Sequence, residues 1–380
     1  MTKTPNTISE LQKLAKKRVP KMFYEYVDAG SWTETTYKAN ENDLQNLRIR
    51  QRIAVDVATR DLKGTMLGEQ VRMPLALAPT GLAGMQIADG EVLAAKAAEE
   101  FGIPFCLSMM SICSVEHVAA HTNRPFWMQL YLIRDRAFIE QLIERARSAG
   151  CSALMLTLDL PVSGLRHRDA KNGLSAPPRL TLTNLADIAT KPAWAIGMLR
   201  TSQRTFGNIV GHVKGLDDLR SLSTWMVSQG DASITWRDVE WVKRLWGGKL
   251  IIKGIMDAQD AHCALAAGAD AVVVSNHGGR QLDGAPSTIS VLPEIVEAVA
   301  GRAAVWVDGG IRSGQDVIKV LACGASAALI GRAFLYGLGA LGEKGVTRAL
   351  EIIFNDLSLT MALCGVRNLS AVDGRILHPR

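Results

Sequence analysis

The sequence lacks the features of several large protein classes. Its six cysteines form no Cys-x-x-Cys pair, and several lie within apolar helix or strand patterns, which is typical of small core residues in a reducing compartment. No apolar stretch is long enough to span a bilayer, and the N-terminus lacks the apolar core of a signal peptide. No long basic run or aromatic–basic repeat occurs, so nucleic-acid binding is not indicated. We expect a cytoplasmic chain.

The composition is that of a soluble enzyme. With 380 residues, 48% of them hydrophobic, the chain can bury a large core, either as two ordinary domains or as one large barrel with insertions. The formal net charge is +6, and the isoelectric point is near 9.0. This basic excess suits anionic small substrates or a negatively charged membrane surface, but an ordinary solvated surface explains it equally well.

Eight short apolar runs have the composition of buried strands, and amphipathic stretches separate most of them. The expected strands are 74–79, 105–109, 127–132, 153–158, 249–253, 271–275, 304–308 and 327–331. The expected helices are 90–101, 136–149, 257–267, 292–299 and 313–323, most of them followed by a glycine that suits a left-handed cap. This repeated βα pattern predicts an α/β fold of the TIM (β/α)8 barrel type.

The chain is expected to form a single domain, 1–380. An N-terminal segment (1–73) precedes the barrel (74–340), and a C-terminal helical segment (341–380) follows it. A long insertion, about 160–248, lies between the fourth and fifth strands. Long loops at an active face are usually lids, but residues 191–200 are apolar with flanking cations, a pattern that also suits contact with a membrane interface.

Polar residues stand at the carboxyl end of nearly every expected strand, where TIM barrels gather their reactive groups. They are Thr80, Ser108, Gln129, Tyr131, Thr157, Asp159, Lys253, His277, Asp308 and Arg332. Buried strand ends need no Lys, His, Asp or Arg for packing. Their joint occurrence therefore predicts an active site.

Two glycine-rich turns follow the last two strands. They read Asp308-Gly309-Gly310-Ile311-Arg312 and Gly331-Arg332, with Ser313 as an expected helix N-cap. Backbone amides beside glycines, together with arginines, suit a phosphate monoester, and TIM barrels commonly hold one there. The alternative is a pair of ordinary tight turns.

The most informative segment is 275–283, Ser-Asn-His-Gly-Gly-Arg-Gln-Leu-Asp. It places a base, His277, and a cation, Arg280, three residues apart, directly after the apolar run 271–274. The paired glycines allow a sharp turn and a close approach to a ligand. By itself, His277 could equally be a satisfied turn residue.

These motifs resemble those of the FMN-dependent L-2-hydroxy acid oxidases and dehydrogenases, which include glycolate oxidase, lactate oxidase, mandelate dehydrogenase and the respiratory L-lactate dehydrogenases. The resemblance runs nearly end to end. It is carried by residues 20–26, 75–81, 129–131, 157–159 and, most specifically, 275–283.

The resemblance implies a role for each matched residue. His277 would be the base that takes the substrate hydroxyl or α proton, with Asp159 as its carboxylate partner and Tyr131 and Lys253 as further catalytic groups. The implied substrate contacts are Tyr26, Tyr131, Arg166, Arg280 and His277, the two arginines clamping the substrate carboxylate. The implied FMN contacts are Pro79, Thr80, Gly81, Ser108, Gln129, Thr157, Lys253 and Ser275 at the ring, and Asp308, Gly309, Gly310, Arg312, Gly331 and Arg332 at the ribityl phosphate. No metal ion is expected.

Three positions bear on the choice of family member. Met110 stands where plant glycolate oxidases carry a pocket Trp, and Gly81 stands where oxidases carry an alanine. Residues 191–215 look most like the respiratory enzymes of the inner membrane face. We therefore expect oxidation of a small 2-hydroxy acid, L-lactate to pyruvate, with electrons passed to a quinone or cytochrome. A homotetramer is also expected, as is peripheral membrane contact through 191–215, so that deleting residues 192–210 should solubilise the chain.

Several alternatives stay open. A hydroxy acid oxidase using oxygen, or an L-mandelate dehydrogenase, would share the chemistry. A redox-neutral FMN barrel such as an isomerase would share the phosphate loops but would not need the set Arg166, Arg280 and His277. A barrel that only binds ligand would be expected to lose His277 or Lys253, and both are present.

Overall fold

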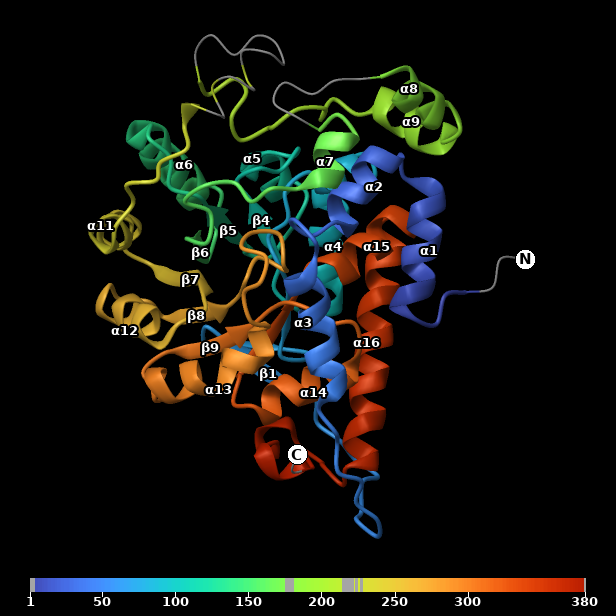
Figure 1. The fold of residues 1–380 in the computed structure, drawn as a ribbon, viewed down its shortest axis with the longest axis vertical. Helices are drawn as coiled ribbons and strands as arrows, with labels where there is room; N and C mark the ends of the chain where they lie inside the picture. Colours follow the sequence, from blue (N-terminus) through green and yellow to red (C-terminus); the bar gives the residue numbers. More distant parts are fainter. Residues whose placement is uncertain (1–3, 175–180, 214–221, 223–224, 226–227, 379–380) are drawn as a thin grey trace.

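A computed structural model describes residues 4–174, 181–213, 222, 225 and 228–378, and in it eight parallel strands form a barrel surrounded by helices (Figure 1). The strands are β3 (Leu75–Leu77), β4 (Cys106–Ser108), β5 (Trp127–Leu130), β6 (Ala153–Thr157), β7 (Lys249–Ile255), β8 (Ala271–Val274), β9 (Ala304–Val307) and β10 (Ala327–Ile330). The sheet order runs from β3 through β10 and back down to β4, and a parallel bridge between Leu77 and Phe105 joins its two ends. The predicted TIM barrel is confirmed.

The strands form where continuous apolar sequence can be buried on both faces. Side chains that point into the barrel build a separate inner cluster in which Trp127 stacks on Trp306 with ring centroids 5.3 Å apart. An antiparallel hairpin, β1 (Gly64–Met66) and β2 (Glu69–Val71), adds Met66 and Val71 to this cluster. The barrel is therefore filled by side chains.

Helices follow the strands as the periodicity predicts. They are α4 (Gly90–Phe101), α5 (Val115–Ala119), α6 (Arg136–Ser148), α11 (Trp236–Trp246), α12 (Ala258–Ala266), α13 (Thr288–Val299), α14 (Gly314–Ala322) and α15 (Arg332–Leu341). Positive φ is found at each glycine expected after a helix, namely Gly102, Gly150, Gly268, Gly301 and Gly324. Ser313 caps α14 as predicted. Helix α13 begins four residues earlier than expected, because Pro293 is accommodated inside the helix instead of marking its start.

The flanking segments cover the outside of the barrel. α1 (Ile8–Arg18) packs on α15, α2 (Lys21–Asp28) lies at the carboxyl end of the strands, and α3 (Thr35–Asn46) lies beside α13. α16 (Glu343–Leu363) runs along α15 and α14 (Figure 1). The short turns η1 (Ala83–Met85), η2 (Leu369–Ala371) and η3 (Gly374–Ile376) complete the described elements.

The insertion contributes α7 (His167–Lys171), α8 (Leu182–Ala189) and α9 (Pro192–Arg200), which lie above α2 (Figure 1). Trp194 of α9 points inward, where it stacks on Phe23 at 5.5 Å and donates a hydrogen bond to the Met85 carbonyl. Further along, Asn208 and Ile209 are fully buried against the barrel. Helix α11, at the end of the insertion, packs beside α6 in the outer ring. Among the described residues, no helix is long and apolar enough to cross a membrane.

Candidate active site

A cavity of about 410 Å³ opens at the carboxyl end of the barrel, between the strand ends, α2 and the insertion. Fifteen of the predicted site residues line it: Tyr26, Pro79, Thr80, Gly81, Tyr131, Arg166, Lys253, His277, Arg280, Asp308, Gly309, Gly310, Arg312, Gly331 and Arg332. They come from six different strand ends, from α2 and from the insertion. The fold therefore brings together groups that are up to about 300 positions apart in the sequence.

The other five predicted residues, Ser108, Gln129, Thr157, Asp159 and Ser275, lie behind the lining. Ser108 Oγ donates to Gln129 Oε1, and Ser275 Oγ accepts hydrogen bonds from Lys253 Nζ at 2.8 Å and from the His277 amide at 3.1 Å. Ser275 therefore supports two site residues. Two buried atoms, Gln129 Nε2 and Thr157 Oγ1, have no hydrogen-bond partner within the protein.

His277 and Asp159 form the pair that the resemblance implies. His277 Nδ1 lies 2.8 Å from Asp159 Oδ1. An ionised Asp159 accepts the Nδ1 proton, which leaves Nε2 as the basic nitrogen. The His277 backbone has φ +57°, and the paired glycines that follow let the chain turn back at once.

The charges around this pair favour a basic imidazole beside an ionised carboxylate. Burial lowers the pKa of His277, more than Asp159 raises it. Burial alone would raise the pKa of Asp159, but His277 and Lys253 lower it. The neutral imidazole can therefore accept a proton, and the adjacent carboxylate stabilises the resulting imidazolium.

Lys253 is a buried cation between two carboxylates. Its Nζ lies 3.6 Å from Asp159 Oδ2 and 3.4 Å from Asp308 Oδ2. Burial alone would lower the pKa of Lys253, but Asp308 and Asp159 raise it, so the ammonium stays charged. The sequence placed Lys253 at the end of its strand, whereas β7 continues to Ile255 through a bulge. Gly254 allows that bulge with φ +110°, since a Cβ there would lie 2.8 Å from Asp159 Cβ.

Arg280 is aimed by the end of α2. Its Nη1 donates to the carbonyls of Tyr26 at 2.6 Å and Ala29 at 2.8 Å, and its guanidinium lies 4.7 Å above the Tyr26 ring. Its buried Nη2 has no hydrogen-bond partner. Burial and the neighbouring Arg166 lower the pKa of Arg280 to about 10, so it remains a cation at neutral pH. Burial raises the pKa of Tyr131, so that phenol stays a hydrogen-bond donor.

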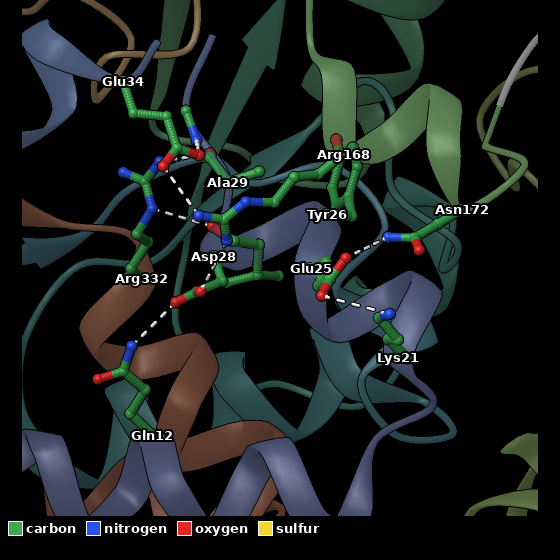
Figure 2. Close-up of polar contacts among 12 residues, drawn as sticks. Gln12, Lys21, Glu25, Tyr26, Asp28, Ala29, Glu34, Arg168, Asn172 and Arg332 are labelled. Atoms are coloured by element: carbon green, nitrogen blue, oxygen red, sulfur yellow. Dashed lines mark hydrogen bonds and ion pairs between the residues drawn. The ribbon is translucent and has the colours of Figure 1, made fainter. Parts of the chain in front are cut away.

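The loops after β9 and β10 form the other end of the cavity. The backbone of Gly309 and Gly310 packs so tightly on α3 that a Cβ at Gly310 would lie 2.2 Å from the Asn40 carbonyl oxygen. Arg312 pairs with Glu41 at 2.8 Å. Arg332 donates to the carbonyls of Val27, Gly278 and Ala29 at 2.8–2.9 Å, the last of which is visible in Figure 2. These arginines therefore line the cavity and also tie its walls together.

The cavity fits FMN. Its lining includes both the polar strand ends and the glycine loops, and two arginines line the latter end, as a phosphate requires. At the other end, the unpartnered Gln129 Nε2 and Thr157 Oγ1 are polar groups that a heterocycle with carbonyl and ring nitrogen atoms would satisfy. Asp308 Oδ1, also buried and unpartnered, suits a ligand hydroxyl.

Two features of the site were not predicted from the sequence. Asp169, on α7, is buried between Arg166 at 3.6 Å and Arg280 at 4.0 Å. Its spacing from Arg166, three residues along a helix, was the available signal. Phe206 of the insertion lines the cavity, and no local pattern indicates that.

No metal ion is expected from the sequence. Among the described residues, one group of possible ligands stands outside the cavity, with Asp89, Cys113 and His117 offering atoms within 4.8 Å of one another. Burial and Glu91 raise the pKa of the Cys113 thiol, and Asp89 accepts a hydrogen bond from Thr201.

Comparison with known proteins identifies the family. The family model for FMN-dependent dehydrogenases matches residues 15–379. A protein named L-lactate dehydrogenase from Caulobacter vibrioides (strain NA1000 / CB15N) is 43% identical over 380 residues, 99% of this chain and 98% of that one. Another of that name, from Pseudomonas syringae pv. syringae (strain B728a), is 42% identical over 376 residues, 98% of each chain.

Solved structures agree. The monotopic membrane protein (S)-mandelate dehydrogenase is 36% identical with a TM-score of 0.94 over 100% of both chains. A mandelate oxidase is 33% identical with a TM-score of 0.82 over 99% of both. The chain therefore belongs to the FMN-dependent dehydrogenase family and is an FMN-dependent 2-hydroxy acid oxidoreductase.

Proposed function

We propose that the chain oxidises L-lactate to pyruvate and passes the electrons to a quinone or cytochrome. The observation that carries the chemistry is the His277–Asp159 pair in the same cavity as Arg166 and Arg280. A base and two carboxylate-binding cations are what a 2-hydroxy acid requires. The choice of L-lactate is supported by the full-length relatives of that name at 42–43% identity.

Each site residue has a distinct task in this proposal. Arg166 and the free Nη2 of Arg280 bind the substrate carboxylate, while Tyr26 and Tyr131 contact and orient the substrate. His277 Nε2 accepts the proton that leaves the hydroxyl or the α carbon, and Asp159 stabilises the imidazolium. When bound, FMN would supply the two-electron acceptor for this oxidation. Lys253, a buried cation that lines the cavity, would stabilise negative charge on the reduced cofactor and so favour electron acceptance.

The residues proposed to hold FMN divide into two groups. The first group would hold the ring, directly or as supports: Pro79, Thr80, Gly81, Ser108, Gln129, Thr157, Lys253 and Ser275. The second group would hold the ribityl phosphate: Asp308, Gly309, Gly310, Arg312, Gly331 and Arg332. The acceptor assignment draws on Gly81. Oxidases of this family carry an alanine at this position. A Cβ at Gly81 would lie 3.2 Å from Tyr26 Oη and 3.3 Å from Met110 Cβ, so an alanine here would require both neighbours to shift.

The first test is the anaerobic visible spectrum of the FMN-loaded protein with L-lactate, and with glycolate, L-mandelate and D-lactate in parallel samples. We expect L-lactate to bleach the flavin band most effectively. L-Mandelate is the second candidate, since the (S)-mandelate dehydrogenase structure superposes with a TM-score of 0.94. Preferential bleaching by L-mandelate would make L-mandelate, not L-lactate, the substrate. A flavin that no hydroxy acid reduces would contradict the redox assignment.

His277→Gln tests the base. The variant should keep bound, yellow FMN, because other residues hold the cofactor, and should lose turnover by roughly 10²- to 10⁴-fold. Stopped-flow reduction at saturating L-lactate separates this loss from acceptor chemistry. Wild-type reduction rates in the variant would rule out His277 as the base.

We also propose peripheral contact with a membrane surface, at the cytoplasmic face of the inner membrane. Leu182 and Leu185 of α8 and Ile196 and Leu199 of α9 expose 48–86% of their surface, while Trp194 holds the pair of helices on α2. Apolar side chains beside Lys191 and Arg200 suit an anionic lipid interface. The predicted contact extends to residue 215, and its last two residues lie outside the described ones.

Point variants test this contact better than the deletion of 192–210 that the sequence suggested. That deletion would remove Asn208 and Ile209, both of which are buried against the barrel. Replacing Leu182 and Leu199 by Asp should instead abolish sedimentation with anionic phospholipid vesicles and leave turnover of L-lactate intact. Leu359→Asp, at an exposed position on α16, is the control. Unchanged sedimentation of the double variant would contradict the proposal.

The predicted homotetramer stays a proposal, which light scattering coupled to size-exclusion chromatography checks.

A further inference from the structure

Asp169 is a buried carboxylate beside the two arginines proposed to bind the substrate, and the proposed chemistry gives it no task. Asp169 exposes 7% of its surface to solvent. Its Oδ2 lies 3.6 Å from Arg166 Nη1 and 4.0 Å from Arg280 Nη2, and its Oδ1 has no hydrogen-bond partner. A carboxylate in this place is unexpected, because it competes with the substrate for the same two cations.

The protein fixes Asp169 in place through its helix. Arg168, the residue before it, bridges Asp28 at 3.2 Å and Glu34 at 2.8 Å, and Asn172 donates to Glu25 at 2.5 Å. Figure 2 shows these contacts joining α7 to α2 and the turn after it. The carboxylate therefore faces the two arginines because α7 is anchored on both sides of it.

Asp169 acts on the arginines through charge more than through hydrogen bonding. Both of its distances exceed a hydrogen-bond length. Arg280 is already aimed by the carbonyls of Tyr26 and Ala29, so it does not need Asp169 for its orientation. What Asp169 changes is the net charge that a ligand meets.

The charge count is simple. Arg166 and Arg280 supply two positive charges, and Asp169 supplies one negative charge, which leaves one positive charge. The nearby Glu25 has its own cation, Lys21, at 4.0 Å. One remaining positive charge matches one substrate carboxylate.

We propose that Asp169 determines charge specificity, restricting the pocket to 2-hydroxy acids with a single carboxylate. This inference rests on the proposed hydroxy acid function and deepens it. Replacing Asp169 by Asn would leave two uncompensated positive charges, and a second carboxylate on the ligand would then be favoured.

The test compares two ligands that cannot react, propionate with one carboxylate and malonate with two. Isothermal titration of the FMN-loaded protein at pH 8 and constant ionic strength gives the ratio of their dissociation constants. In Asp169→Asn this ratio should shift toward malonate by about tenfold, the size expected for one added charge at close range in a partly screened pocket. Asp169→Glu keeps the charge and should keep the wild-type ratio.

Glu144→Gln is the matched control. Glu144 pairs with Arg147 three residues along on the exposed face of α6, so this change removes a charge from the same kind of pair far from the cavity. An unchanged ratio in Asp169→Asn overturns the proposal, including the case in which both ligands weaken equally, which would show that Asp169 only aims Arg166. Because binding is measured without turnover, this result is independent of whether L-lactate reduces the flavin.

Discussion

Asp159→Asn probes the charge that is proposed to make His277 a base. Asparagine keeps the shape of the side chain but removes the carboxylate that lies 2.8 Å from His277 Nδ1 and 3.6 Å from Lys253 Nζ. The resting imidazole keeps a hydrogen-bond partner, whereas the imidazolium formed during turnover loses its counter-charge. We therefore expect the change to act mainly on the reaction and little on FMN binding.

The size of the effect follows from the geometry. Two unit charges about 4 Å apart interact by about 4 kcal/mol at an effective dielectric constant near 20. Since each 1.36 kcal/mol is about tenfold in rate, kcat/KM should fall about 10³-fold. The pH profile should move as well. Asp159 raises the pKa of His277 against the larger lowering by burial, so without Asp159 that pKa falls further and the acid limb of kcat/KM shifts to lower pH.

The assay is anaerobic flavin reduction by L-lactate across a range of pH. Asp270→Asn is the control, because Asp270 also pairs with two lysines, Lys243 at 2.8 Å and Lys249 at 2.9 Å, but at the amino end of β7. It should leave the rate and profile unchanged. Two results for Asp159→Asn would refute the assignment of Asp159 as the partner of the base. One is a kcat/KM at the pH plateau within a few-fold of the wild-type value, and the other is an acid limb displaced to higher pH.

Three further outcomes are expected. Arg280→Lys should raise KM for L-lactate about tenfold or more in steady-state assays, because an ammonium cannot bind two carbonyls and a carboxylate with one planar fork; an unchanged KM would remove that role. Gly310→Ala should reduce the flavin-to-protein ratio after purification, since its Cβ would meet the Asn40 carbonyl at 2.2 Å; full FMN occupancy would contradict this. Asp270→Asn should lower the free energy of unfolding at pH 7 by about 1 kcal/mol. Because the pKa of Asp270 is lowered in the folded state, its carboxylate contributes less stability as the pH falls. The difference in free energy of unfolding between wild type and variant, measured by denaturant titration, should therefore shrink below about pH 4, and growth of that difference would contradict the reasoning.

The barrel could be predicted from sequence because its signals are local. Runs such as Ala271–Val274 are apolar at every position, which only a strand buried on both faces requires. The positive-φ glycines after the helices marked where each helix ends. The polar strand ends followed from the same logic, since TIM barrels place reactive groups at one end.

The insertion shows where that logic stops. Trp194 reads as part of an apolar segment suited to a membrane, yet it faces Phe23 of α2. Its partner lies about 170 positions earlier in the chain, so no periodicity within the segment could reveal which face is covered. The resemblance implies Ser275 as a cofactor contact, whereas its contacts with Lys253 and His277 become visible only once β7 and β8 are paired.

The end of α2 explains why the site works as a unit although its parts are distant in sequence. The carbonyls of Tyr26, Val27 and Ala29 accept hydrogen bonds from Arg280 and Arg332, and Asp28 accepts one from Arg168. The carbonyls at a helix end have no hydrogen-bond partner within the helix, and they favour cations. This helix end thus binds cations from the proposed substrate end, from the proposed phosphate end and from the insertion. A displacement of this helix end would therefore disturb all three at once.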